Sequence, residues 1–157
     1  MRVNRFQEHV LVLPEDDYNR QLANGFLLEP GVRNIQVLRV AGGWLKVLDC
    51  FQSDHIRGMD DYPGRFMVLL IDFDGHPERV DEAKARIPAR LIDRVLVLGV
   101  LTEPERLPTR LGSFETIGRA LAKDCREGTD TTWGHALLQH NASELDRLRE
   151  RVRPILF

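Results

Sequence analysis

Short apolar runs alternate along the chain with stretches in which apolar residues recur every three or four positions. Runs of leucine and β-branched residues that end at Pro, Gly or Asp predict strands. Residues 66–73 form the most apolar run, as expected of a central parallel strand that is covered on both faces. The predicted strands are residues 9–13, 35–40, 66–73 and 94–101.

Helical spacing fills the intervals between these strands. Ser113 is a suitable N-cap for one of these helices, and an acid follows in its first turn. The segment Ser143-Glu144-Leu145-Asp146 resembles a capping box and would open the last helix. The predicted helices are residues 15–28, 44–57, 77–87, 113–127 and 133–140, with a last helix from residue 143.

The alternation of strands and helices implies parallel strands, right-handed crossovers and helices on both faces of one sheet. The expected fold class is therefore α/β, with a four-stranded, mainly parallel sheet and extra C-terminal helices. A length of 157 residues matches one ordinary domain, so residues 1–157 are expected to form a single unit.

Composition narrows the classes of protein that remain. A hydrophobic fraction of 43% and a charged fraction of 29% exclude disordered, collagenous and coiled-coil chains. The longest apolar run, residues 66–71, is far shorter than the roughly 20 residues that a membrane-spanning helix needs. The N-terminus lacks an apolar signal core, and Cys50 and Cys125 make no disulfide framework, so a soluble cytoplasmic protein is expected. A net charge of −2 means that nucleic-acid binding requires a local patch or bridging metal ions.

Acidic residues follow three of the four predicted strands: Glu15 and Asp16 the first, Asp72 and Asp74 the third, and Glu103 the fourth. The carboxyl ends of parallel strands meet at one edge of a sheet, so these side chains are expected to lie close together. Their mutual repulsion would be relieved by a cation, and carboxylate oxygens select Mg²⁺, Mn²⁺ or Ca²⁺. Asp72 and Asp74 are two residues apart, so on an extended chain both carboxylates could bind one ion.

A glutamate after the first strand, an Asp-x-Asp after the third and this order of elements resemble the TOPRIM fold of topoisomerases, primases and OLD nucleases. More closely, the chain resembles small bacterial TOPRIM-like proteins related to the OLD nuclease domain. The resemblance covers about residues 9–105, with residues 113–157 as a C-terminal helical extension. The chain departs from the family at Asp16, where many members have glycine, and at Asn19, where many have an acid.

The resemblance implies a nuclease-like enzyme that uses Mg²⁺ or Mn²⁺ for phosphoryl transfer on nucleic acid. It implies that Asp72 and Asp74 bind the metal, that Glu15 is a ligand or the general base, and that Glu103 is a further ligand. Asp16 is a secondary candidate. His76 is another, because a histidine titrates near neutral pH and could donate to a phosphate oxygen. Nucleic-acid binding by the chain alone is expected to be weak, with a partner such as an ATPase supplying more surface.

Two other functions remain open. Acids after the first strand and Asp72 after the third are also typical of receiver-like signalling domains, with Asp72 as the phosphoacceptor. The separation of Asp16 from Asp72 is long for that fold, and no lysine occupies the place that it requires. The chain could instead be a degenerate TOPRIM-like module that only binds a partner. The C-terminal arginines alternate with Glu144, Asp146 and Glu150, a pattern typical of a solvated helix face that could contact phosphate.

Overall fold

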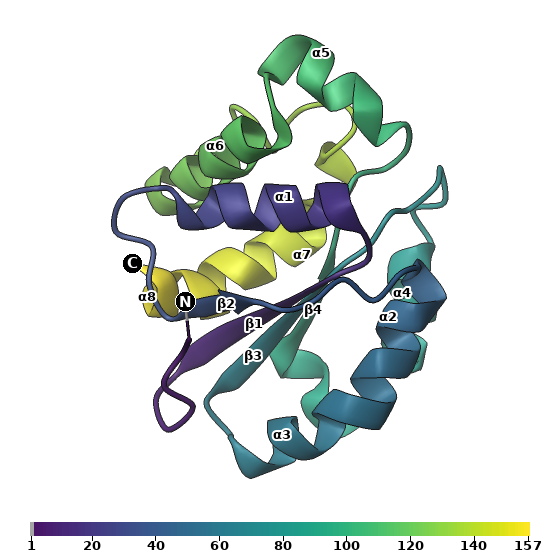
Figure 1. Ribbon diagram of the computed structural model, residues 1–157, viewed down its shortest axis with the longest axis vertical. Helices are drawn as coiled ribbons and strands as arrows, with labels where there is room; N and C mark the ends of the chain where they lie inside the picture. Colours follow the sequence, from purple (N-terminus) through teal and green to yellow (C-terminus); the bar gives the residue numbers. More distant parts are fainter. Residues whose placement is uncertain (1) are drawn as a thin grey trace.

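The computed structural model, which describes residues 2–157, has a four-stranded sheet at its centre (Figure 1). All neighbouring strands are parallel, and their order across the sheet is β2-β1-β3-β4. The predicted α/β fold class is therefore confirmed. The strands are β1 (His9–Pro14), β2 (Ile35–Val37), β3 (Arg65–Leu70) and β4 (Val95–Leu98).

Helices cover both faces of this sheet. The α-helices are α1 (Asp17–Leu27), α2 (Trp44–Cys50), α3 (Ile56–Asp61), α4 (Arg79–Ala85), α5 (Leu107–Leu111), α6 (Phe114–Glu127), α7 (Ala142–Arg147) and α8 (Arg153–Leu156). π-Helical turns join α2 to α3 (Phe51–His55) and α7 to α8 (Leu148–Val152). Shorter 3₁₀ turns cover Ala89–Arg94, Pro104–Arg106 and Gln139–Asn141. None of the helices in residues 2–157 has the length and apolarity needed to cross a membrane.

Alternate residues of each strand enter two separate apolar clusters, as the two-residue period of a strand requires. In β3, Val68 points to the face covered by α1, α6 and the C-terminal helices. Met67 and Leu69 point to the other face, which is covered by α2, α3 and α4 (Figure 1). Because both faces are buried, the central strands consist almost entirely of apolar residues.

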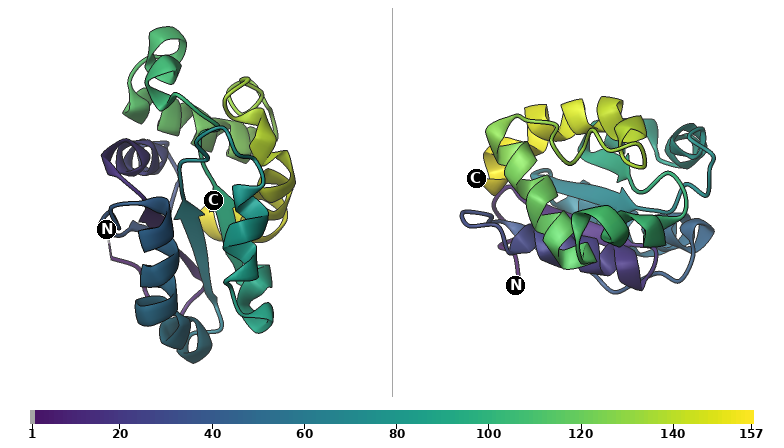
Figure 2. Two further views of the ribbon diagram at one scale, coloured as in Figure 1. Left: turned by 90° about the vertical axis from the view of Figure 1, so that its right-hand side faces the viewer. Right: turned by 90° about the horizontal axis from the view of Figure 1, so that it is seen from above.

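α6 lies directly against α1, and glycines make this close approach possible. A Cβ atom on Gly118 would lie 2.0 Å from the carbonyl oxygen of Leu22, and one on Gly25 would lie 2.1 Å from that of Glu115. Any side chain at these two positions would push the helices apart. α5 precedes α6 and lies at one end of the longest axis of the molecule (Figures 1 and 2).

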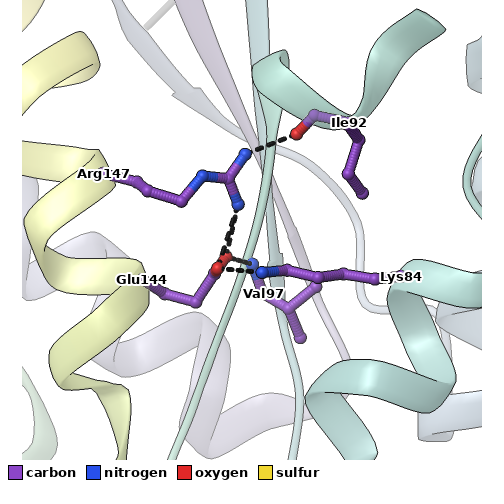
Figure 3. Close-up of polar contacts among 5 residues, drawn as sticks. All are labelled: Lys84, Ile92, Val97, Glu144 and Arg147. Atoms are coloured by element: carbon purple, nitrogen blue, oxygen red, sulfur yellow. Dashed lines mark hydrogen bonds and ion pairs between the residues drawn. The ribbon is translucent and has the colours of Figure 1, made fainter. Parts of the chain in front are cut away.

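β4 is an edge strand, and side chains from the Gln139–Asn141 turn and from α7 bond its free peptide groups. The Asn141 side-chain oxygen accepts from the Gly99 N–H (3.1 Å), and the Asn141 amide donates to the Gly99 carbonyl (2.9 Å). The Glu144 carboxylate accepts from the Val97 N–H at 2.9 Å (Figure 3). It also accepts from Lys84 of α4 and from Arg147, which donates in turn to the Ile92 carbonyl. The edge is thus covered without a fifth strand.

Glu144 corrects one sequence-based expectation, because it is 3% exposed and not part of a solvated face. The capping box at Ser143 is also absent, since α7 begins one residue earlier, at Ala142. The physical reason is the edge of β4, where the buried Val97 N–H needs an acceptor. The Glu144 carboxylate supplies it, and this face of the helix therefore turns inward.

Two predicted helices differ clearly from the structure. The helix that begins at Trp44 continues through Gly58 to Asp61, and a Cβ atom at Gly58 would lie 2.5 Å from the Arg65 guanidinium. Residues 133–140 form turns and not an α-helix. The buried Asp124 carboxylate accepts from the N–H groups of Thr132 (2.6 Å) and Trp133 (3.2 Å), which holds this segment against the end of α6.

Candidate functional site

The sheet has a topological switch point between β1 and β3. The connection that leaves β1 runs through α1 on one face to β2, whereas the connection that leaves β3 runs through α4 on the other face to β4. The carboxyl ends of β1 and β3 therefore separate two diverging connections, which is where open α/β sheets bind ligands. The first turns of α1, α2 and α4 gather at this end of the sheet, on the right-hand side of Figure 1.

Glu15 joins the ends of these two strands. Its N–H donates to the Leu70 carbonyl (2.8 Å), and its carboxylate accepts from the Asp72 N–H (2.5 Å). Burial raises the pKa of the Glu15 carboxyl above its usual range. The hydrogen bond from Asp72 opposes this shift, while the negative charges of Asp16 and Asp72 add to it. Glu15 is thus a half-buried acid with other acids as neighbours.

Asp16 is the N-cap of α1, a position that favours aspartate. Its carboxylate accepts from the backbone N–H (3.2 Å) and from the side-chain amide (2.9 Å) of Asn19. Burial raises the pKa of Asp16 as well, the two bonds from Asn19 oppose this, and the charge of Asp72 adds to it. Capping therefore fixes the position of Asp16 without neutralising its charge.

Asp72 and Asp74 do not share one face as they would on an extended chain. Asp72 accepts from the Asp74 N–H through its side chain (3.0 Å), and the Asp74 backbone is left-handed, with a φ of 51°. Gly75 follows with a φ of 78°, so the chain turns sharply here. The Asp74 side chain is 74% exposed and lies 3.7 Å from the Arg79 guanidinium. Only Asp72 stays beside Glu15 and Asp16.

Glu103 and His76 lie in loops at the same end of the sheet. Glu103 is exposed and accepts from the Arg106 guanidinium at 2.9 Å. His76 is also exposed and lies 3.2 Å from the Glu78 carboxylate. The structure therefore brings together three of the six predicted site residues, Glu15, Asp16 and Asp72, which are called the acidic cluster below.

Two residues that the sequence analysis did not select border the acidic cluster. The Tyr18 hydroxyl is buried and has no hydrogen-bond partner within residues 2–157. Burial raises its pKa, and the charges of Asp72 and Asp16 raise it further. Arg79, in the first turn of α4, donates to the Asp72 carbonyl (2.8 Å), and its guanidinium lies 4.5 Å from the centre of the Trp44 ring. The sequence signal for Arg79 is its position, since it is the first basic side chain of the Lys/Arg type after the Asp-x-Asp segment.

The ligand geometry decides which metals the acidic cluster could hold. Across residues 2–157, no three side chains of His, Cys, Asp or Glu converge closely enough to hold a metal ion between them. A closed site of the kind that zinc prefers is thus not present in that part of the chain. Magnesium commonly keeps several waters and uses one or two carboxylates together with phosphate oxygens of a substrate. The acidic cluster fits this second mode of binding.

Comparisons with protein-family models, with curated proteins and with solved structures found no match. The possible roles of the acidic cluster follow from its position and chemistry. One or two of its carboxylates can contribute to binding a hydrated cation, Glu15 can accept a proton, and the switch point can bind a polar ligand.

Proposed function

We propose that this protein is an enzyme of phosphoryl transfer on nucleic acid, a nuclease-like TOPRIM-like domain that uses Mg²⁺ or Mn²⁺. One observation carries the proposal: Glu15, Asp16 and Asp72 lie together at the switch point of a parallel sheet, and their charges repel one another. A cation that binds there would relieve this repulsion. Phosphate chemistry is the most common use of a magnesium site that is incomplete without its substrate.

Each acid has a distinct part in this proposal. Asp72 and Asp16 would hold the ion, directly or through water. Asp74 would join them by turning its exposed carboxylate away from Arg79, and Glu103 would have to leave Arg106 to do so. The bound ion would lower the pKa of a water nucleophile and neutralise charge on the phosphate. Glu15 would act as the general base, because its raised pKa lies closer to neutrality than that of an ordinary glutamate.

The charge of the chain supports a partner in nucleic-acid binding. The net charge is −2, and few phosphates would be neutralised by free cations on the surface. Nucleic-acid binding by the chain alone is therefore weak in this proposal, and a partner such as an ATPase supplies the remaining surface. Cys50 and Cys125 form no disulfide, which agrees with a reducing cytoplasmic setting.

Nicking of plasmid DNA and cleavage of single-stranded DNA in Mg²⁺ and in Mn²⁺ test the proposal. We expect weak, metal-dependent cleavage that is lost in Glu15→Gln and in Asp72→Asn. Asp81→Asn is the matched control, because Asp81 is an exposed acid on α4 outside the acidic cluster, and it should retain full activity. Cleavage that persists in Asp72→Asn would come from a contaminant and would contradict the proposal.

A receiver-like domain would use the same acids, and two observations disfavour it. Lys84 is bonded to Glu144 and is not available at the end of the sheet. α7 also covers the edge of β4, where the next strand of such a domain would stand. Incorporation of phosphate at Asp72 from acetyl phosphate would support the receiver-like function. Absence of both metal binding and phosphate incorporation would favour a module that only binds a partner.

A further inference from the structure

Arg79 is held beside the acidic cluster by two contacts with groups that carry no net charge. Its guanidinium donates to a neutral acceptor, the Asp72 carbonyl, and stacks on the Trp44 ring. Its nearest carboxylate, on Asp74, lies 3.7 Å away and is 74% exposed, so that ion pair is weak. Yet the Arg79 side chain is only 15% exposed. The fold thus fixes the position of this positive charge beside the acidic cluster.

This charge is unfavourable for metal binding alone. Arg79 already acts on Glu15, whose pKa it lowers against the larger effect of burial. A cation bound by the same acidic cluster would be repelled by the guanidinium. If the cluster served only to hold a metal ion, a neutral residue would perform better at position 79. A negatively charged group that arrives with the metal ion would offset this repulsion, because both positive charges attract it.

The guanidinium has donors free for such a partner. Within residues 2–157 it makes one hydrogen bond, through Nη1, and its other nitrogens are absent from the buried polar atoms that lack a partner. Those nitrogens consequently remain in contact with solvent. A guanidinium presents its donors in a planar fork that matches two oxygens of a phosphate. The stacking on Trp44 and the bond to Asp72 fix this fork in advance, which reduces the entropy lost on binding.

We propose that Arg79 contacts a phosphate of the nucleic-acid substrate, on which the metal ion acts from the side of the acidic cluster. The inference rests on the proposed function and adds a definite consequence to it. Metal ion and phosphate bind cooperatively, because each compensates a charge that opposes the other: the phosphate neutralises Arg79, and the metal ion neutralises the acids. Metal alone binds weakly, and so does nucleic acid alone.

Two affinities, measured separately in the full-length protein, test this inference. The first is the affinity for Mn²⁺ alone, from the electron paramagnetic resonance signal of the free ion. The second is the affinity for a short fluorescent oligothymidylate with phosphorothioate linkages, which resist cleavage, in saturating Mn²⁺. The variants are Arg79→Gln and Arg79→Lys. Arg86→Gln is the matched control, because Arg86 bonds to Asp49 and Gln52 away from the acidic cluster.

Removal of the charge should move the two affinities in opposite directions. In Arg79→Gln we expect Mn²⁺ to bind about two- to fivefold more tightly, because a repulsive charge is gone. The oligonucleotide should bind about tenfold more weakly, because a charge-assisted hydrogen bond is lost. Arg79→Lys should retain the Mn²⁺ affinity of the wild type and lose only part of the oligonucleotide affinity. Arg86→Gln should change neither.

The opposite signs separate phosphate contact from a purely structural role. If Arg79→Gln weakens both affinities while its circular dichroism spectrum is unchanged, Arg79 only supports the Asp72 loop and the inference is overturned. An unchanged oligonucleotide affinity would also overturn it, without affecting the proposed function. If the wild type binds Mn²⁺ neither alone nor together with the oligonucleotide, the proposed function itself fails and the inference with it.

Discussion

Two glutamates, one over the edge strand β4 and one at the carboxyl end of the inner strand β1, have opposite electrostatic surroundings. Glu144 lies over the edge of β4 and accepts from a strand N–H, a lysine and an arginine (Figure 3). Glu15 lies at the carboxyl end of β1 and also accepts from a main-chain N–H, that of Asp72, but its neighbours include two more carboxylates. The charge of Glu144 is compensated by the chain itself. That of Glu15 is compensated only in part, by the Asp72 N–H and by Arg79, and this difference distinguishes a structural acid from one suited to a ligand.

The comparison also shows why burial alone says little about function. Glu144 is the more buried of the two, yet its partners come from three elements and hold the C-terminal helices to α4 and β4. Removing one member of such a network leaves the others uncompensated. Removing a member of the acidic cluster instead relieves repulsion. Substitutions at the two sites should therefore change stability in opposite directions.

The largest effect is expected at Glu144. Glu144→Ala should lower the free energy of unfolding by about 3 kcal/mol, because it leaves Lys84, Arg147 and the Val97 N–H without their acceptor. Urea denaturation measures this change. Glu144→Gln should lose less, since its amide oxygen still accepts from Val97. Glu150→Ala, at an exposed position on the neighbouring turn, should change stability by less than about 0.5 kcal/mol. A loss below about 1 kcal/mol in Glu144→Ala would show that the network contributes little to stability.

The next largest effect is the stabilisation of the protein by metal ions, which should depend on the acidic cluster and not on Glu144. Mg²⁺ or Mn²⁺ at one hundred times its dissociation constant should stabilise the protein by about 2.7 kcal/mol, because the ion binds only the native state. Thermal denaturation with and without Mn²⁺ measures this. Glu144→Gln should keep the full response, whereas Asp72→Asn should lose it. A melting temperature that millimolar Mn²⁺ leaves unchanged in the wild type would count against the metal site.

A smaller effect, of opposite sign to that at Glu144, is expected at Glu15 in metal-free buffer. Glu15→Gln should raise the free energy of unfolding at pH 7, by less than Glu144→Ala lowers it, because burial and the neighbouring acids disfavour the charged form of Glu15. Its amide oxygen can still accept from the Asp72 N–H. A loss of stability would mean that the Glu15 charge has a favourable partner in the native protein.

The same substitution should alter the pH dependence of stability. The raised pKa of Glu15 means that the native protein holds this proton to a higher pH than the unfolded chain, where the value is near 4.5. Between the two pKa values the native state binds more protons, so the wild type loses stability as the pH rises. Glu15→Gln lacks this loss. Its advantage should thus be near zero at about pH 4 and grow towards neutral pH, as measured by denaturation at each pH. A difference in unfolding free energy between the two proteins that stays constant with pH would contradict the raised pKa of Glu15.

The smallest effect is expected at Asp74. Its carboxylate is 74% exposed and only 3.7 Å from Arg79 at its nearest, so Asp74→Asn should change stability by less than about 0.5 kcal/mol without metal. Thermal denaturation of Asp74→Asn, Asp72→Asn and the wild type in metal-free buffer measures this change. A large loss would show that the Asp74 charge holds the loop in place.

The sequence allowed the strands and the grouping of three acids at their carboxyl ends to be predicted, because both depend on short-range patterns. The apolar run before Asp72 predicted the central strand, and the strand-end rule then placed Glu15, Asp16 and Asp72 at one edge. The same rule did not reveal that Asp74 turns outward. Its backbone is left-handed, a local conformation that an Asp-Gly pair permits but does not require.

The inward orientation of Glu144 and the position of Arg79 could not be predicted in this way. Both depend on contacts between elements far apart in the chain: Glu144 bonds to Val97, and Arg79 stacks on Trp44. Charged residues at helical spacing are usually solvated, and only the unpaired edge of β4 makes burial of Glu144 favourable. The turns over residues 133–140 depend in the same way on Asp124, which lies in the preceding helix.

The cover over β4 also limits how copies of this chain could associate through their sheets. A parallel sheet has two edges, and strands of other molecules can add wherever peptide groups are free. Asn141 and Glu144 occupy those groups at Gly99 and Val97, so within residues 2–157 the β2 side is left for such addition. Propagation of stacked sheets into a fibre needs two open edges per molecule. Edge-to-edge growth from β2 would therefore stop at a pair of molecules, because the Asn141 and Glu144 side chains block the β4 edge of each.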